Sequence, residues 1–301
     1  MAETTARVEL SLGLPNFGGW PGPDPRSLVA VARAADDAGV DRLVVSDHVV
    51  LGNRTDAYAW GRFPTGPDGP WLEPLACLTA FATATSRVRL ATGILIAPLR
   101  PAALLAKSVA TLDVLSGGRV DLGVGVGWQQ EEYAALGLDF ARRGRLLEET
   151  VAGCRALWTG LPASYDGDRV RFADVYCVPQ PVQRPLPVWF AGTLNDRNVR
   201  RIVEMGDGWI PIMGASLDDI RTGATRLREA AGRPLSVQAP VPPVRDDAGR
   251  VDIGATMAGV PDLVAAGVTN VYVNIASFAR SAAEGSAVVP RVVDAFRAAW
   301  S

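Results

Sequence analysis

Short apolar stretches alternate with longer amphipathic stretches along nearly the whole chain. The run Leu43-Val44-Val45 has the length and the β-branched content of a buried parallel strand. Residues 25–38, just before it, place apolar side chains at helical spacing, and Gly39 follows as a helix terminator. The same succession of strand and helix recurs to the C-terminus, which indicates an α/β fold.

The pattern resolves into eight strand and helix pairs. Strands are predicted over 8–15, 43–45, 87–98, 119–128, 188–191, 208–212, 235–241 and 268–275. Helices are predicted over 25–38, 71–85, 100–115, 142–158, 196–205, 217–231, 253–266 and 287–300, with one more over 129–136. Because the alternation is strict and no linker interrupts it, we expect one (β/α)8 TIM barrel spanning residues 1–301.

Two segments are longer than ordinary barrel loops. Residues 51–70, after the second strand, are rich in glycine, proline and aromatic residues. Long loops in compact domains are usually lids or binding loops, although a packed surface loop has the same composition. Residues 164–184, before the fifth strand, are predicted to form an inserted hairpin with Asp166-Gly167 at its turn.

The second strand ends on Asp47 and on His48, which is the only histidine of the chain. Parallel α/β folds house their chemistry at the carboxyl ends of the strands, so this pair is a candidate site. A solvated turn, or a histidine that caps the next segment, is the alternative. In a barrel, the residues that end the other strands would converge on the same mouth: Asn16, Ile94, Trp128, Gly192 and Asn274.

Several glycines occupy positions where a side chain is expected. Gly93 interrupts the third strand, which usually marks a bulge or a close backbone approach. Gly123, Gly125 and Gly127 alternate along the fourth strand, so their shared face is either a tight packing surface or the floor under a flat ligand. Gly192-Thr193 precedes a helix start, where backbone N–H groups either seat a phosphate or are simply capped.

Composition narrows the possible partners. A net charge of -2 gives no electrostatic reason to expect nucleic acid or an anionic membrane. No apolar run approaches a membrane span, and the first residues lack a signal-peptide pattern. The three cysteines are far apart and indicate reduced thiols, so we expect a cytoplasmic protein. With one histidine and no cysteine cluster, we expect no zinc or other metal site.

Four segments together resemble a known family. They are LVVSDHVV at 43–50, GRFPTGPDGPWLEPL at 61–75, the stretch 87–128 from RVRLATGILIAP to LGVGVGW, and PVWFAGTLNDRNVRRIVEMGDGWIP at 187–211. In this order and spacing they resemble the luciferase-like monooxygenase superfamily, and within it the oxidoreductases that use the deazaflavin coenzyme F420. The resemblance covers nearly the whole chain and is weakest after about residue 232.

The resemblance implies roles for particular residues. Asp47 and His48 would lie beside the deazaflavin ring, and a non-proline cis peptide at Gly93-Ile94 would support the back of that ring. The other implied cofactor contacts lie along the ring and ribityl chain and around the phosphate: Gly125, Val126, Gly127, Ala191, Gly192 and Thr193.

The chain departs from related sugar-phosphate dehydrogenases of this family. They have an acidic residue where this chain has Trp128, an aromatic residue where it has Val50 and Leu51, and a lysine cluster for which this chain offers only Lys107. A phosphorylated sugar is therefore a poor fit. We expect an apolar or planar substrate, in a pocket formed by Asn16, Phe17, Trp60 and Trp128.

The implied reaction is hydride transfer between F420 and a small organic substrate. Histidine ordinarily titrates near neutral pH, so His48 is the candidate acid or base, while Asp47 would orient it or hydrogen-bond the ring. One alternative is an FMN-dependent monooxygenase that consumes molecular oxygen; another is a flavin-binding barrel without catalysis. The family resemblance also implies a homodimer, with which the apolar helix predicted over 100–115 is compatible.

Overall fold

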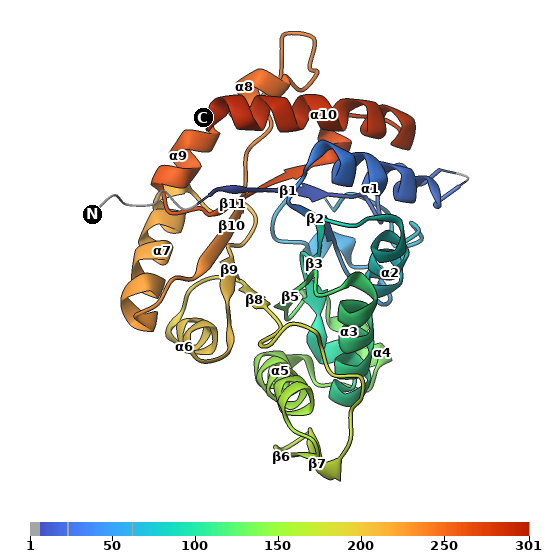
Figure 1. Cartoon of the computed structure of the whole chain (residues 1–301), viewed down its shortest axis with the longest axis vertical. Helices are drawn as coiled ribbons and strands as arrows, with labels where there is room; N and C mark the ends of the chain where they lie inside the picture. The colour runs from blue at the N-terminus through green and yellow to red at the C-terminus, as the bar shows by residue number, and fades with distance from the viewer. Residues whose placement is uncertain (1–6, 23, 62, 301) are drawn as a thin grey trace.

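Parallel strands close into a barrel in the computed structural model, which describes residues 7–22, 24–61 and 63–300 (Figure 1). The hydrogen-bonded order is β3-β2-β1-β11-β10-β9-β8-β5, and β3 also pairs with β5, which closes the ring. The predicted TIM barrel is confirmed. Its strands are β1 (Glu9–Gly13), β2 (Arg42–Val45), β3 (Arg89–Thr92), β4 (Leu95–Ile96), β5 (Val120–Gly125), β8 (Val188–Ala191), β9 (Gly208–Ile210), β10 (Ser236–Pro240) and β11 (Asn270–Asn274).

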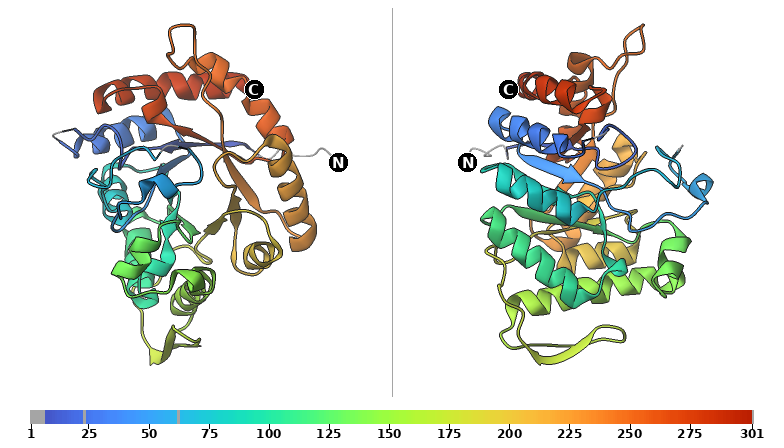
Figure 2. Two further views of the ribbon diagram at one scale, coloured as in Figure 1. Left: turned by 180° about the vertical axis from the view of Figure 1, so that it is seen from behind. Right: turned by 90° about the vertical axis from the view of Figure 1, so that its right-hand side faces the viewer.

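Helices surround this barrel, as the two views of Figure 2 show. They are α1 (Ser27–Ala38), α2 (Pro74–Ala84), α3 (Ala102–Ser116), α4 (Gln130–Ala135), α5 (Arg143–Thr159), α6 (Asp196–Met205), α7 (Leu217–Ala231), α8 (Ile253–Met257), α9 (Val260–Ala265) and α10 (Ala282–Ala299). Short 3-10 turns are η1 (Thr55–Ala57), η2 (Ala97–Leu99), η3 (Phe140–Arg142) and η4 (Ile275–Ser277). Within the described residues, no helix is long and apolar enough to cross a membrane.

Many predicted elements differ from the observed ones by one to three residues at their ends, and three differences are larger. The third predicted strand is broken into β3 and β4 at Gly93-Ile94, whose peptide bond is cis. The helix predicted over 253–266 is two helices, because Pro261 removes a backbone donor and restarts the helix within the first turn of α9. Helix α10 begins five residues before position 287, since the Ser281 side chain caps it by accepting the Glu284 N–H.

The insertion before β8 is a hairpin, as predicted. It consists of β6 (Ala163–Asp166) and β7 (Arg171–Val175), which pair in antiparallel fashion at the lower end of Figure 1. The expected turn at Asp166-Gly167 is displaced, because β6 ends at Asp166 and the Gly167 N–H donates to the Val170 carbonyl across a four-residue connection.

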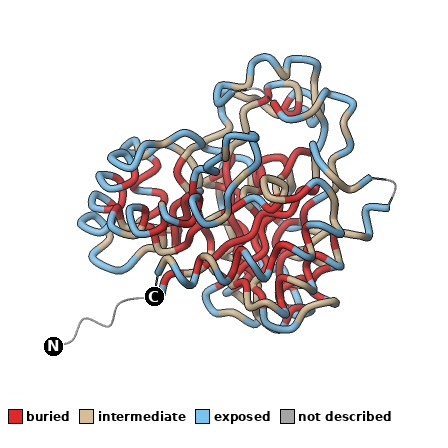
Figure 3. Tube along the Cα trace, turned by 90° about the horizontal axis from the view of Figure 1, so that it is seen from above, coloured by how far each residue is buried: buried red, intermediate tan, exposed pale blue. Residues whose placement is uncertain are grey.

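The apolar core lies between the barrel strands and the helices, where Figure 3 shows nearly continuous burial. Alternate strand residues such as Leu10, Leu12, Leu43 and Leu90 are fully buried and belong to this layer. The inside of the barrel is filled by a different set of side chains, many of them polar, so the barrel is a packed core and not a channel.

A buried ion cluster lies in that interior. Asp121 on β5 accepts from Arg42 on β2 at 2.7 Å and from Arg89 on β3 through two bonds of 2.7 Å. The Arg42 guanidinium also lies 4.7 Å from the centre of the Trp189 ring. Burial by itself would raise the pKa of Asp121, but the charges of Arg42 and Arg89 outweigh it and hold that pKa below its usual range.

We expect Asp121→Ala to lower the free energy of unfolding by about 3–5 kcal/mol, because it leaves buried guanidinium charge without a partner. Urea unfolding measures the loss. Since the pKa of Asp121 is depressed in the fold, its stabilisation is fully present above the unfolded carboxyl pKa of about 3.9 and is lost as pH falls through the folded value.

Asp166→Ala is the matched control, because Asp166 pairs with Arg171 on the surface of the hairpin. An exposed pair of this kind is worth about 0–1 kcal/mol. Equal losses in the two variants would show that the Asp121 cluster is not a buried electrostatic anchor.

Candidate active site

His48 is held by a carboxylate that comes from a distant part of the chain. Its Nδ1 lies 2.7 Å from Oε2 of Glu132 on α4, in the connection after β5. The other oxygen of Glu132 accepts the Val49 N–H at 2.8 Å. The Glu132 side chain is 0% exposed and that of His48 is 6% exposed, so the pair is fixed in a dry environment.

This pairing determines which nitrogen of His48 is available. An ionised carboxylate can only accept hydrogen bonds, so Nδ1 is the donor and the lone pair of the neutral ring is on Nε2. Nε2 has no hydrogen-bond partner among the residues that the structure describes. His48 therefore presents a proton acceptor, or a donor when protonated, on the side of the ring away from Glu132.

Aromatic rings surround the imidazole of His48. The ring centroids of Trp71, Trp128 and Phe63 lie 4.6, 5.8 and 5.9 Å from it, all in edge-on arrangements. Phe17 stacks on Trp71, with ring centroids 3.6 Å apart and the two planes nearly parallel. The walls near His48 are thus apolar and flat.

The long segment after β2 crosses the barrel mouth. Tyr58 in this segment donates a hydrogen bond of 3.3 Å to the sulfur of Met213, which follows β9, on the opposite side of the barrel from β2. At its start, Gly52 exchanges hydrogen bonds of 2.8 and 3.2 Å with the Gln129 side chain. The right-hand view of Figure 2 shows the segment extending beyond one end of the barrel. Trp60 is 40% exposed and contacts Tyr58 at its edge.

Asp47 is engaged by the protein on both oxygens. Oδ2 accepts from the Ile96 N–H at 2.8 Å and from Arg100 at 2.6 Å, while Oδ1 accepts from Arg100 at 2.9 Å. Arg100 also reaches Glu73 at 2.9 Å. Burial lowers the pKa of Arg100, but its two carboxylate partners outweigh this and raise it. The geometry makes Asp47 an anchor for the strand end that carries His48.

The glycine between β3 and β4 and the glycines of β5 let neighbouring strands pack closely. A Cβ on Gly93 would lie 2.4 Å from Val44, and one on Gly123 would lie 2.0 Å from the Thr92 carbonyl. A Cβ on Gly125 would lie 2.8 Å from Ile94. The tight-packing interpretation thus holds for Gly123 and Gly125, and the cis peptide expected at Gly93-Ile94 is present. Contact of these residues with a cofactor stays a prediction.

The segment after β8 leaves backbone donors at the mouth. Gly192 has φ +123°, where other residues are strained, and its carbonyl accepts from Trp209 at 2.8 Å. Asn195 caps α6 by accepting the Asn198 N–H at 2.9 Å. Within the described chain, the Thr193 N–H has no acceptor. The cap of α6 therefore leaves this donor, at the predicted position of the cofactor phosphate, available.

The remaining predicted residues divide by accessibility. Asn16 is 0% exposed, and its amide bonds to the Ser46 backbone at 2.7 and 3.0 Å and to the Leu72 carbonyl at 2.8 Å, so it ties loops together. Thr193 and Asn274 are exposed. Six other predicted residues are partly accessible at the mouth: Ile94, Val126, Gly127, Trp128, Ala191 and Gly192.

Two important residues were not singled out from the sequence. Glu132 lies inside the helix predicted over 129–136, and an acidic pair, Glu131-Glu132, one turn after the strand end at Trp128 is the signal that could have identified it. Arg100 begins the predicted helix 100–115, where it has the character of an ordinary surface residue. Within the described residues, no group of three or more His, Cys, Asp or Glu side chains is placed to hold a metal ion.

Comparison with known proteins identifies the family of this chain. The model of the luciferase-like monooxygenase family matches residues 5–248, and the chain belongs to that family. An uncharacterized protein of Mycobacterium tuberculosis is 35% identical over 244 residues, 77% of this chain and 86% of its own length. An F420-dependent glucose-6-phosphate dehydrogenase of Amycolatopsis mediterranei is 33% identical over 200 residues, 64% of this chain and 55% of the relative.

A third relative uses a different cofactor. An FMNH(2)-dependent dimethylsulfone monooxygenase of Pseudomonas putida is 34% identical over 155 residues, 50% of this chain and 42% of the relative. The family thus includes F420 enzymes and FMN enzymes.

Solved structures share the fold. The monooxygenase RslO1 of Streptomyces bottropensis superposes with a TM-score of 0.80 over 98% of this chain and 100% of its own, at 17% identity. An F420-dependent secondary alcohol dehydrogenase superposes with a TM-score of 0.77 over 97% of this chain and 99% of its own, also at 17% identity.

The neutral tautomer of His48 is directly testable, because the chain has a single histidine and gives one set of imidazole signals. We expect ¹⁵N NMR of neutral His48 to show a protonated Nδ1 and an unprotonated Nε2, since Glu132 holds the Nδ1 proton. In Glu132→Ala, the preference for the Nδ1-protonated tautomer should weaken, so that a mixture of the two neutral tautomers is seen. A protonated Nε2 in the unaltered chain would contradict the geometry.

Proposed function

We propose that the protein is an F420-dependent oxidoreductase that moves a hydride between the deazaflavin and a small organic substrate. The observation that carries the proposal is the buried His48–Glu132 pair at the barrel mouth, where Nε2 of His48 has no partner among the described residues and can meet a ligand. Hydride transfer to a carbonyl carbon leaves a negative oxygen that needs a proton, and the reverse reaction needs that proton removed.

The residues present fit such a cofactor. Ile94 and Gly127 are partly accessible at the mouth, and the Thr193 N–H beside the start of α6 has no acceptor among the described residues. A backbone donor next to a helix N-terminus is a suitable seat for a phosphate group. When bound, the deazaflavin would supply the two-electron hydride chemistry.

The chain's own part of the reaction is to hold the substrate and move the proton. Glu132 fixes the orientation of His48 and stabilises the ring when it is protonated, so Glu132 is a positioning residue. Both oxygens of Asp47 are bonded to Arg100 or Ile96, so Asp47 holds the strand end that carries His48. The ring walls of Trp71, Trp128 and Phe63 exclude water and favour a planar or apolar substrate.

An FMN-dependent monooxygenase is the second candidate. It is favoured by the similarity to the dimethylsulfone monooxygenase of Pseudomonas putida. It predicts oxygen consumption, whereas hydride transfer with a deazaflavin proceeds without oxygen.

We propose further that the protein forms a homodimer through an apolar surface on α3 and the segment after β7. Leu104 and Leu115 on α3 are 60% and 54% exposed, and Tyr176, Val178 and Val182 are 68%, 53% and 56% exposed. Lys107 joins the two segments by donating to the Val178 carbonyl. Exposed apolar groups gathered in this way often mark a protein contact.

The cofactor is tested by titrating the purified protein with F420 and with FMN, following absorption and heat. We expect F420 to bind at least about tenfold more tightly than FMN, about 1.4 kcal/mol in binding free energy. Tighter FMN binding together with substrate-dependent oxygen consumption would support the monooxygenase instead.

Sedimentation velocity on the same sample checks the homodimer, which a monomer at micromolar concentration would contradict.

The proton step is tested with reduced F420 and a panel of planar ketones, enones and quinones under anaerobic conditions. We expect His48→Gln to lower kcat by about 10²–10⁴-fold while F420 binding changes little, because proton transfer and not ring binding is lost. Glu132→Gln should lower kcat less and alter its pH profile. Glu131→Gln is the matched control, because Glu131 is on the same helix but forms no hydrogen bond to His48 among the described residues, and it should retain full turnover. Full turnover in His48→Gln would exclude the acid–base role.

A further inference from the structure

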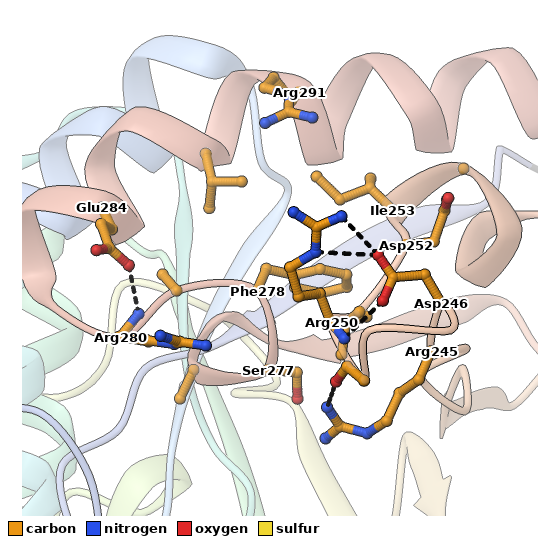
Figure 4. Close-up of a pocket in the computed structure, with 16 residues that line it drawn as sticks. Arg245, Asp246, Arg250, Asp252, Ile253, Ser277, Phe278, Arg280, Glu284 and Arg291 are labelled. Atoms are coloured by element: carbon orange, nitrogen blue, oxygen red, sulfur yellow. Dashed lines mark hydrogen bonds and ion pairs between the residues drawn. The ribbon is translucent and has the colours of Figure 1, made fainter.

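A cavity of about 760 Å³ lies away from His48, at the edge of the barrel face formed by the connections after β10 and β11 (Figure 4). Its walls come from the segment 245–254, from η4 and the residues just after it, and from the first half of α10. Its volume lies in the range of small-molecule sites. None of its lining residues belongs to the His48–Glu132 site.

Four arginines line this cavity: Arg245, Arg250, Arg280 and Arg291. They come from three separate segments, and Figure 4 shows Arg250 and Arg291 extending toward the same space from opposite sides. The chain has a single lysine, Lys107, so a basic cavity in this protein has to be built from arginine. Guanidinium groups bind phosphate and carboxylate through paired donors, which suits recognition of an anion.

The acidic residues of the lining are already engaged. Asp246 accepts from the Arg250 side chain at 3.0 Å and from the Arg250 N–H at 2.8 Å. Asp252 caps α8 by accepting the Ala255 N–H at 2.8 Å. Glu284 accepts the Arg280 N–H at 2.8 Å.

The guanidinium groups of three lining arginines lack a carboxylate partner within the described residues. Arg245 donates only to the Gly249 carbonyl, at 2.7 Å, and the side chains of Arg280 and Arg291 form no ion pair. Like charges that converge on one cavity repel one another unless an anion lies between them. The four arginines outnumber the three carboxylates of the lining, so the cavity carries a net formal charge of one positive unit.

Apolar side chains form another part of the lining. Ile253, Phe278 and Val288 come from the same three segments, and Figure 4 places Phe278 between Arg280 and Arg250. A ligand that uses the whole cavity would have an apolar or ring-shaped body in addition to its charge.

We propose that this cavity binds a small organic anion that carries phosphate or carboxylate groups on an apolar body. The guanidinium groups of Arg280 and Arg291 hold the charge, and Phe278 contacts the body. Two sources have this chemistry: a free metabolite, or the protein's own cofactor with its phosphate in this cavity instead of at the Thr193 N–H proposed above. The proposal does not depend on the oxidoreductase assignment, since it rests on a different set of residues.

Isothermal titration of the full chain with phenyl phosphate at low salt tests the site. Inorganic phosphate, which lacks the apolar body, is the comparison ligand. We expect phenyl phosphate to bind at least about tenfold more tightly than inorganic phosphate. The double variant Arg280→Gln/Arg291→Gln should lose at least about tenfold in affinity, while Arg33→Gln should bind like the original chain. Arg33 is the matched control, an exposed arginine on α1 outside the cavity.

Two results would overturn the proposal. One is that folded protein, as its thermal unfolding temperature shows, does not bind phenyl phosphate at millimolar concentration. The other is an equal loss of affinity in Arg33→Gln, which would show attraction to surface charge in general. Repeating the titration on protein saturated with F420 or FMN separates the two sources, because loss of binding assigns the cavity to the cofactor's phosphate and retained binding assigns it to a separate metabolite.

Discussion

The carboxylate of Asp47 lies in a dry strand end, where an unpaired charge would cost several kcal/mol. It is tolerated because Arg100 meets both of its oxygens and the Ile96 N–H meets one of them. These bonds join the end of β2 to β4 and to the start of α3. The position of the next residue, His48, depends on this junction, since a shift of the strand end would move the imidazole away from Glu132.

Two buried acids thus serve the same strand end in different ways. Asp47 and His48 are consecutive, and consecutive side chains of an extended chain point to opposite sides. Asp47 turns toward the permanently charged Arg100, whereas His48 turns toward Glu132. A carboxylate beside arginine has no reason to exchange a proton, and one beside histidine can stabilise a ring that gains or loses one. The two carboxylates therefore differ through their partners: Arg100 makes Asp47 an anchor, and His48 gives Glu132 a part in the proposed proton transfer.

The barrel also explains how one family accommodates F420 and FMN enzymes. The strands, the cis peptide and the close-packed glycines form a rigid frame, while the mouth is built from loops. The segment that carries Tyr58 covers His48, and the arginine-lined cavity lies at another part of the same face. Loop side chains at the mouth can therefore differ between relatives while the barrel stays the same.

Periodicity in the sequence determined the eight-fold alternation and the bounds of helices α6 and α7, because each depends on local apolar spacing and caps. It also marked the Asp47-His48 strand end, and the resemblance to a known family identified the cis peptide at Gly93-Ile94. Only the tertiary structure showed that His48 meets Glu132, which is 84 positions away, and that Arg100 takes up Asp47. Such pairings follow from the register at which the barrel closes. A local pattern shows that a charged residue is present, but the closed sheet decides which opposite charge it meets.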